Sequence, residues 1–259
     1  MINTTMPFQG AKPKIRIITD DIRFTNKIVP LSVDLIVTSP PYNVCIPYNS
    51  YQDDLSHADY LDFSKQWLGK CYELTKSTGR MCLNIAIDNN KNVKSALASD
   101  VTQVAQEVGW KYKTTIIWAK PTCKHEHIRG TWCSAQAPRV IPPAELIIVF
   151  YKHSWEKIGG SGINNITKEE FIQWTKGIWE LKWDSRNGKK WINHPVPFPR
   201  ELPRRCIKLF SYVGDTILDP FMGSGTTLVE AIVNERFSIG VDREKEYCRV
   251  AFDRCRELL

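Results

Sequence analysis

The residues Ser39, Pro40, Pro41 and Tyr42 form a tetrapeptide that directly follows the apolar run 33–38. The run is short and rich in β-branched residues, which predicts a buried strand with the tetrapeptide at its carboxyl end. Two consecutive prolines fix φ and remove two backbone N–H groups, so the neighbouring carbonyl groups are presented as rigid acceptors. Ser39 adds a hydroxyl group and Tyr42 a flat aromatic face. A rigid turn without any ligand is the structural alternative.

These groups suit a planar base that carries an exocyclic amino group. The ring would stack on Tyr42 while the amine donates hydrogen bonds to Ser39 and to the Pro40 carbonyl. Such an amine is a weak nucleophile because its lone pair is delocalised into the ring, so it needs to be oriented and polarised beside an in-line methyl group. No covalent enzyme intermediate is needed.

A second candidate site lies in the run Asp219-Pro-Phe-Met-Gly-Ser-Gly-Thr226, between the apolar segment 216–219 and the helical pattern 228–234. A strand, a glycine-containing turn and a helix in this order allow the backbone to approach a bound nucleotide closely. No lysine follows the second glycine, which excludes a Walker-type phosphate loop, and the third glycine of a dinucleotide fingerprint is missing. The loop alone is therefore a weak signal.

An acidic residue at the end of the next apolar run strengthens this interpretation. Asp242 ends the run 237–241 and lies seventeen residues after Gly225. A carboxylate at the end of the strand that follows such a loop can accept hydrogen bonds from both ribose hydroxyls. Capping of the following helix is the alternative role for Asp242. Because loop and acid occur together at suitable spacing, the sequence favours a nucleoside site.

These residues need a sheet to hold them, and the apolar patterns predict one. Short apolar runs bounded by turn or polar residues predict buried strands at 15–19, 33–38, 81–86, 114–118, 145–151, 216–219 and 238–242. Helical spacing recurs between them at 60–74, 93–108, 202–209, 228–234 and 244–258. This alternation predicts an α/β fold with a mostly parallel, doubly wound sheet, which binds ligands at the carboxyl ends of its strands. The stretch 153–199 breaks the rhythm, so we expect an insertion with one short helix at 168–176 that does not continue the sheet.

Together, Thr38-Ser-Pro-Pro-Tyr-Asn43 and the run 219–227 resemble motifs IV and I of the amino-methylating DNA methyltransferases. With the catalytic motif first and the cofactor loop last, the chain resembles the permuted β group, in which the target-recognition region lies between them. The resemblance covers nearly the whole chain and includes 194–202, which is similar to the segment that packs over the methionine part of the cofactor. It implies a Rossmann-like methyltransferase fold with a mixed seven-stranded sheet, helices on both faces and an inserted target-recognition region.

The resemblance also implies a mechanism and a set of site residues. The expected reaction is direct in-line transfer of a methyl group from S-adenosylmethionine to a base flipped out of duplex DNA. The expected catalytic residues are Ser39, Pro40, Pro41 and Tyr42. The expected cofactor-binding residues are Asp20 or the adjacent Asp21 at the adenine, together with Pro40, Phe198, Asp219, Phe221, Gly223, Ser224, Gly225, Thr226 and Asp242.

The first residue of the catalytic tetrapeptide bears on the identity of the base. In this family serine usually accompanies cytosine N4, and aspartate or asparagine accompanies adenine N6. Ser39 therefore favours cytosine N4, while adenine N6 stays open because some enzymes with this tetrapeptide act on adenine. More distant alternatives are an RNA or protein amide methyltransferase, whose turn generally begins with asparagine, and a DNA-binding protein without activity.

Basic and aromatic residues are concentrated in one part of the chain. Between Lys120 and Lys208 there are sixteen Lys or Arg residues against eight Asp or Glu, and six of the nine tryptophans lie between Trp132 and Trp191. This mixture suits a surface that binds nucleic-acid phosphates, although a merely solvated basic face is the alternative. The residues expected to contact DNA are Arg129, Trp132, Arg139, Lys182, Arg186, Lys189 and Lys190.

The chain is expected to form one domain over 1–259, with a catalytic half at 1–152, a recognition insertion at 153–193, a DNA-facing loop at 122–139 and a cofactor-binding half at 194–259. Its 42% hydrophobic and 24% charged residues are ordinary for a globular protein. Because neither a signal peptide nor a membrane span is evident, we expect a cytoplasmic location. The spacing of Cys123, His125, His127 and Cys133 is not a common zinc pattern, so no metal is expected. A cognate restriction endonuclease is the protein partner that the resemblance suggests.

Overall fold

One mixed sheet organises the computed structural model, which describes residues 14–44, 53–88, 95–120, 130–138, 140, 143–157, 162–181 and 198–258. The order of the strands across the sheet is β1-β8-β7-β2-β3-β5-β4-β6. The strands are β1 (Ile15–Thr19), β2 (Val33–Thr38), β3 (Thr75–Ala86), β4 (Lys111–Ala119), β5 (Ala144–Tyr151), β6 (Ile178–Glu180), β7 (Thr216–Asp219) and β8 (Phe237–Asp242). The pairs from β1 to β3 are parallel, β5 is antiparallel to both of its neighbours, and β6 is parallel to β4.

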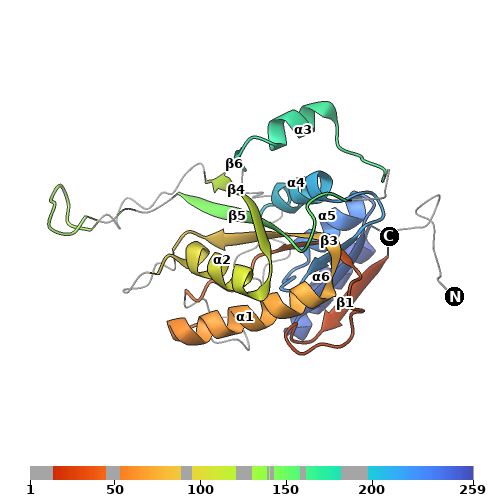
Figure 1. Cartoon of the computed structure of the whole chain (residues 1–259), viewed down its shortest axis with the longest axis horizontal. Helices are drawn as coiled ribbons and strands as arrows, with labels where there is room; N and C mark the ends of the chain where they lie inside the picture. Colours follow the sequence, from red (N-terminus) through yellow and green to blue (C-terminus); the bar gives the residue numbers. More distant parts are fainter. Residues whose placement is uncertain are drawn as a thin grey trace.

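Helices cover both faces of this sheet (Figure 1). They are α1 (His57–Leu74), α2 (Leu97–Val108), α3 (Lys168–Trp174), α4 (Glu201–Phe210), α5 (Thr226–Val233) and α6 (Lys245–Arg256). The apolar sides of α1 and α2 pack with β2, β3 and β5 in one core that includes Trp67 and Trp110. On the other face, α4 packs over a second core, and α5 meets α6 in a third. This confirms the predicted α/β fold with helices on both faces.

Within the described residues, the sheet has one strand more than the seven that we predicted. The additional strand, β6, lies inside the stretch that the sequence pattern had excluded from the sheet, so that exclusion was wrong. It is only three residues long, too short for an alternating pattern to be recognised, yet it pairs with β4 from Ile117↔Ile178 to Ala119↔Glu180. The middle residue, Trp179, is fully buried and fills the core under α4.

Part of the basic, tryptophan-rich stretch packs within the fold. Trp174 and Trp179 are both buried, and the Arg205 guanidinium lies 5.5 Å and 5.3 Å from their ring centroids. Arg204 and Lys208 of the same helix pair with Glu170 on α3. A cation that stacks on an aromatic ring and pairs with a carboxylate stabilises this layer. These basic residues of α4 therefore have partners within the fold, and the expected phosphate-binding face elsewhere in the stretch stays a prediction.

The register of the central strands brings the two sequence motifs together. β2 and β7 are parallel neighbours, with Leu35 opposite Ile217 and Ile36 opposite Leu218. The carboxyl ends of parallel strands meet at one edge of a sheet. The Ser-Pro-Pro-Tyr turn after β2 and the glycine-containing turn after β7 therefore open on the same side, although about 180 residues separate them in the chain.

Candidate active site

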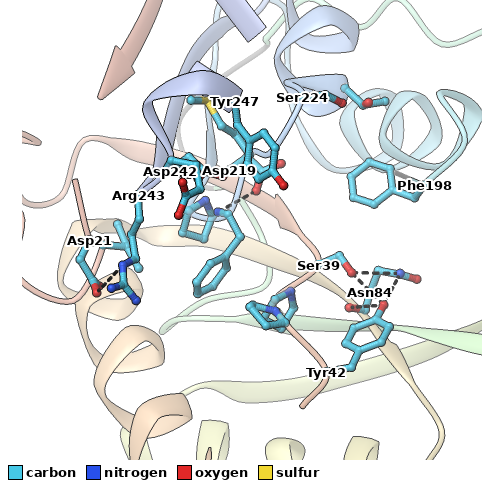
Figure 2. A pocket seen from close by; sticks show the side chains of 18 of the residues that line it. Asp21, Ser39, Tyr42, Asn84, Phe198, Asp219, Ser224, Asp242, Arg243 and Tyr247 are labelled. Atoms are coloured by element: carbon cyan, nitrogen blue, oxygen red, sulfur yellow. Dashed lines mark hydrogen bonds and ion pairs between the residues drawn. The ribbon is translucent and has the colours of Figure 1, made fainter. Parts of the chain in front are cut away.

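A cavity opens at the carboxyl ends of β1, β2, β7 and β8. In Figure 2, Ser39, Tyr42 and Asn84 gather at one end of it, while Asp219, Asp242 and Tyr247 lie at the other. All four catalytic residues expected from the sequence line the cavity. Most of the expected cofactor-binding residues line it too: Asp20, Pro40, Phe198, Asp219, Phe221, Ser224, Thr226 and Asp242. Gly223 and Gly225 do not.

The Ser-Pro-Pro-Tyr turn is held from outside the cavity. The Tyr60 hydroxyl of α1 donates a 2.8 Å hydrogen bond to the Pro41 carbonyl. Asn43 follows the turn with a φ of 57°, in the left-handed region that asparagine tolerates better than most residues. Its side chain exchanges hydrogen bonds with the backbone of Leu55, at 2.7 and 2.9 Å. The turn is therefore fixed before any ligand binds.

Four polar side chains form a network under this turn. Ser39 Oγ lies 2.7 Å from Tyr42 Oη, and Tyr42 Oη donates to Glu145 Oε2 at 3.0 Å. Asn84 Nδ2 donates to Tyr42 Oη at 2.8 Å and to Glu145 Oε2 at 2.7 Å. The second carboxylate oxygen of Glu145 pairs with Lys120 Nζ. Burial, followed by the negative charge of Glu145, raises the pKa of Tyr42 well above its ordinary value, so the phenol stays protonated.

Asn84 and Glu145 were not predicted as site residues, although both leave a trace in the sequence. Asn84 is the one polar residue in the run Met81-Cys-Leu-Asn-Ile-Ala86, and Glu145 is the one charged residue of β5. A polar residue in the middle of a buried strand needs a partner, because leaving it unpaired is costly. That partner comes from the neighbouring strand, since Asn84 faces Ile147 and Glu145 faces Ala86 in the β3–β5 register.

The glycine-containing turn is shaped by close packing. Gly225 begins α5 with a φ of 79°, and a Cβ at this position would lie 2.7 Å from the Ala251 Cβ of α6. The Gly223 N–H donates a 2.9 Å hydrogen bond to Asp242 Oδ2. Arg254 of α6 donates to the carbonyl and hydroxyl oxygens of Ser224 at 2.6 and 2.9 Å. The two glycines thus set the path of the turn, and Ser224 and Thr226 present it to the cavity.

Two buried carboxylates lie at the inner end of the cavity. Burial raises the pKa of Asp219 to about 6, although Thr227, Thr38 and the Phe221 N–H donate hydrogen bonds to it. Burial also raises the pKa of Asp242 to about 6, against hydrogen bonds from the Glu244 and Gly223 N–H groups. Their negative charges are poorly solvated, so a ligand that carries a positive charge or hydroxyl donors would stabilise them.

The carboxylates at the end of β1 have partners within the chain. Lys27 lies 3.0 Å from Asp20 Oδ2 and lowers the pKa of Asp20. Burial would raise the pKa of Asp21, but hydrogen bonds from Arg23 outweigh it and lower the pKa. Arg243 approaches Asp21 to 3.8 Å from the other side, as the dashed line in Figure 2 shows. Both acids are therefore charged near neutral pH.

The walls of the cavity fit an adenosyl ligand such as S-adenosylmethionine. Ile22, Phe63 and Phe221 provide an apolar surface on which a purine ring could pack, and the two phenylalanine rings contact each other with their centroids 6.1 Å apart. Asp242 offers acceptors for ribose hydroxyl groups at the end of β8. Asp219 and Asp242 together favour the sulfonium and ammonium charges of the methionine part. The described residues thus supply both the acceptor groups and the apolar contacts that this cofactor requires.

Most of the residues expected to contact DNA lie outside the described part of the chain. These are Arg129, Arg139, Lys182, Arg186, Lys189 and Lys190, and the same holds for Cys123, His125 and His127. Trp132 is described and is 72% exposed, in the short segment that the Gly130–Pro138 bridge closes. It does not line the cavity. Its expected contact with DNA stays a prediction.

The described residues contain neither a membrane-spanning helix nor a cluster of metal-ligating side chains. No described helix combines the length and the apolar character needed to cross a bilayer. In the same described part of the chain, no group of three or more His, Cys, Asp or Glu side chains is arranged so that it could hold a metal ion.

Comparison with known proteins places these features in a family. The family model for DNA methylases of the N6/N4 type matches residues 33–253. The Type II methyltransferase M.MjaVI of Methanocaldococcus jannaschii is 47% identical over 173 residues, which are 66% of this chain and 88% of the relative. A second methyltransferase of that organism, M.MjaI, is 29% identical over 269 residues, with 89% of this chain and 87% of the relative covered.

Solved structures show the same fold. TTHA0409 of Thermus thermophilus, in complex with S-adenosyl-L-methionine, superposes with a TM-score of 0.73 at 24% identity, over 95% of both chains. The cytosine-N4-specific PvuII DNA methyltransferase gives a TM-score of 0.73 at 20% identity, over 94% of this chain and 86% of that one. The match to the family model covers both cavity motifs, with the catalytic turn before the cofactor loop. The chain therefore belongs to the S-adenosylmethionine-dependent DNA methylases of the N6/N4 amino-methyltransferase family, in their permuted form.

Proposed function

We propose that this enzyme methylates the N4 amino group of cytosine in duplex DNA. The observation that carries the proposal is Ser39, whose hydroxyl lies at the cavity beside the Pro40 carbonyl at the end of β2. Two uncharged acceptors at this position suit an amine that donates hydrogen bonds. A serine here favours cytosine N4 on the resemblance described above, and the same fold and site would also serve adenine N6.

In the proposed reaction the target cytosine is flipped out of the duplex into the cavity. Ser39 and Pro40 accept hydrogen bonds from its amine, and Tyr42 offers its ring for stacking. Pro41 keeps the turn rigid, with its carbonyl bound by Tyr60. S-adenosylmethionine supplies a methyl group that its sulfonium makes electrophilic. Asp242 would hold the ribose, and Ile22, Phe63 and Phe221 would enclose the adenine.

The context of the reaction is part of the proposal. Relatives over most of the chain are named Type II methyltransferases, which supports a role in a restriction–modification system beside a cognate endonuclease. We propose that region 153–193 and the loop 122–139 select the target sequence. Replacement of Lys189 and Lys190 by glutamate should then weaken DNA binding and reduce its salt dependence. The same change at Lys65, which is exposed on α1, should have little effect.

Product analysis tests the proposed reaction. The protein is incubated with S-adenosylmethionine and unmethylated bacterial DNA, which is then digested to nucleosides and analysed by mass spectrometry. N4-methylcytosine is the expected product, and N6-methyladenine would reassign the base while leaving the reaction class intact. Competition between duplex DNA and RNA addresses the more distant alternative. Methylated RNA or protein without any modified deoxynucleoside would refute a DNA substrate.

A further inference from the structure

The network beneath the catalytic turn has a fixed direction of hydrogen bonding. A carboxylate can only accept, so Tyr42 Oη and Asn84 Nδ2 must both donate to Glu145 Oε2, at 3.0 and 2.7 Å. Tyr42 has a single hydroxyl proton. The carboxylate of Glu145 is a stronger acceptor for it than the backbone carbonyl of Asn84, which lies 3.4 Å from Tyr42 Oη. The Tyr42 proton is therefore committed to Glu145.

This commitment decides how Ser39 is oriented. The 2.7 Å contact between Ser39 Oγ and Tyr42 Oη could in principle run in either direction. Because the Tyr42 proton is used by Glu145, Tyr42 must accept and Ser39 must donate. The proton of Ser39 then points at Tyr42 Oη and is not available to a ligand. Apart from a long 3.4 Å approach by Asn84 Nδ2, the lone pairs of Ser39 stay available as acceptors for a ligand.

We propose that Glu145 is a positioning residue that acts through Tyr42 and makes the Ser39 hydroxyl an acceptor for the exocyclic amine of the target base. This inference rests on the proposed function and adds a residue to it. Glu145 is 8% exposed, on a different strand from the catalytic turn, and its second oxygen is held by Lys120. Lys120 in turn lies 4.9 Å from the ring centroid of Trp118, which lines the cavity.

The direction of these hydrogen bonds, from Ser39 through Tyr42 to Glu145, lets the site distinguish an amino group from a carbonyl group on the bound base. Cytosine presents an NH2 donor at C4, whereas uracil presents an oxygen acceptor at the same atom. A Ser39 that can only accept binds the first and repels the second. The hydrogen bonds that link Glu145 to Ser39 would thus favour binding of the reactive base over its deaminated form, independently of the contacts that read the surrounding DNA sequence.

Glu145→Gln is expected to reverse the direction of the hydrogen bonds that link residue 145, Tyr42 and Ser39. Lys120 can only donate, so it should hold the oxygen of the new amide and leave the NH2 group facing Tyr42 and Asn84. The Asn84 amide would turn over to accept, and Tyr42 would accept from Gln and donate to Ser39. The Ser39 proton would then be free to point into the cavity, where it would repel the hydrogens of an amine and donate a hydrogen bond to a carbonyl oxygen.

The experiment measures binding and turnover separately. Wild type first identifies the methylated sequence in unmethylated bacterial DNA, and a duplex with that sequence is then prepared with cytosine or uracil at the target position. With S-adenosylhomocysteine present, wild type should prefer cytosine by about tenfold, and Glu145→Gln should show a smaller preference, because the Pro40 carbonyl is then the remaining fixed acceptor. Its kcat should fall by about 100-fold with little change in KM. If the product is N6-methyladenine, adenine and hypoxanthine replace the two pyrimidines.

Two further variants keep the test decisive if Glu145→Gln folds poorly. Glu145→Asp retains a group that can only accept, so it should retain the preference for the amine even if turnover falls. Tyr42→Phe removes the hydroxyl group that links Glu145 to Ser39. It should therefore reduce the preference for the amine, and Glu145→Gln should have no further effect in the double variant. Glu107→Gln, exposed on α2, is the matched control.

Wild-type base preference and turnover in Glu145→Gln, or an additive double variant, would overturn the inference. A wild type that modifies no DNA base would instead overturn the proposed function.

Discussion

The Thr38 hydroxyl donates a 2.8 Å hydrogen bond to Asp219 Oδ1, across 181 positions of the chain. Thr38 is the last residue of β2 and directly precedes the catalytic Ser39, while Asp219 is the last residue of β7 and precedes the cofactor turn. Both side chains are buried. One hydrogen bond thus fixes the ends of two neighbouring strands, and with them the distance between the site for the base and the site for the methyl donor.

Removal of this hydroxyl should therefore affect both stability and catalysis. Thr38→Val keeps the shape of the side chain but leaves the buried Asp219 carboxylate with one hydrogen bond fewer, at a cost of about 1–3 kcal/mol in the free energy of unfolding. Denaturant titration measures this loss, and we also expect a lower kcat. Thr102→Val on α2 is the control, since that hydroxyl only donates to the Ala98 carbonyl of its own helix. An equal loss in both variants would contradict the assigned role of Thr38.

The raised pKa of Asp219 predicts how stability depends on pH. An acid whose pKa is about 6 in the folded chain and 3.8 ordinarily binds a proton at a higher pH when folded. The free energy of unfolding therefore decreases as pH rises from about 4 to above 6. Asp219→Asn removes this contribution, and at pH 8 it should stabilise the ligand-free protein by up to about 3 kcal/mol.

Urea titrations of wild type and Asp219→Asn between pH 4.5 and 8 check this expectation. The variant should retain a smaller slope, because the pKa of Asp242 is also raised to about 6. Its affinity for S-adenosylmethionine should fall, since the negative charge that faces the cationic ligand is lost. A variant with the same slope and affinity as wild type would show that Asp219 is neither protonated near pH 6 nor involved in binding the cofactor.

Ser39→Ala tests the catalytic turn directly. The variant loses the acceptor for the target amine but keeps both prolines, so turnover should fall by about 100-fold or more while DNA affinity changes far less. Single-turnover methylation and DNA titration give the two quantities. Ser32→Ala, whose hydroxyl donates to the Val29 carbonyl away from the cavity, should behave as wild type. Equal loss of turnover and affinity in Ser39→Ala would contradict the role proposed for the hydroxyl.

The sequence could predict those parts of the site that are continuous in the chain. The turns at Ser39 and Gly223 follow strands whose apolar pattern is clear, and the structure brings both turns to one cavity. Glu145 and Asn84 escaped because their role depends on which strands are neighbours, and nothing in the local pattern states that β3 pairs with β5. The role of Trp179 could not be predicted, because basic and aromatic residues occur together in a cation–π layer just as they do on a nucleic-acid surface.

Gly225 provides the last test, because its two constraints act together. Its φ of 79° lies in the left-handed region, and an added Cβ would meet the Ala251 Cβ at 2.7 Å. Gly225→Ala should therefore lower the free energy of unfolding by about 1–3 kcal/mol and displace the cofactor turn from α6. Gly177→Ala is the matched control, since a Cβ there meets no atom within 4 Å. Thermal unfolding with and without S-adenosylmethionine separates the two effects: strain alone lowers both midpoints equally, whereas a displaced turn also reduces the stabilisation that the cofactor gives.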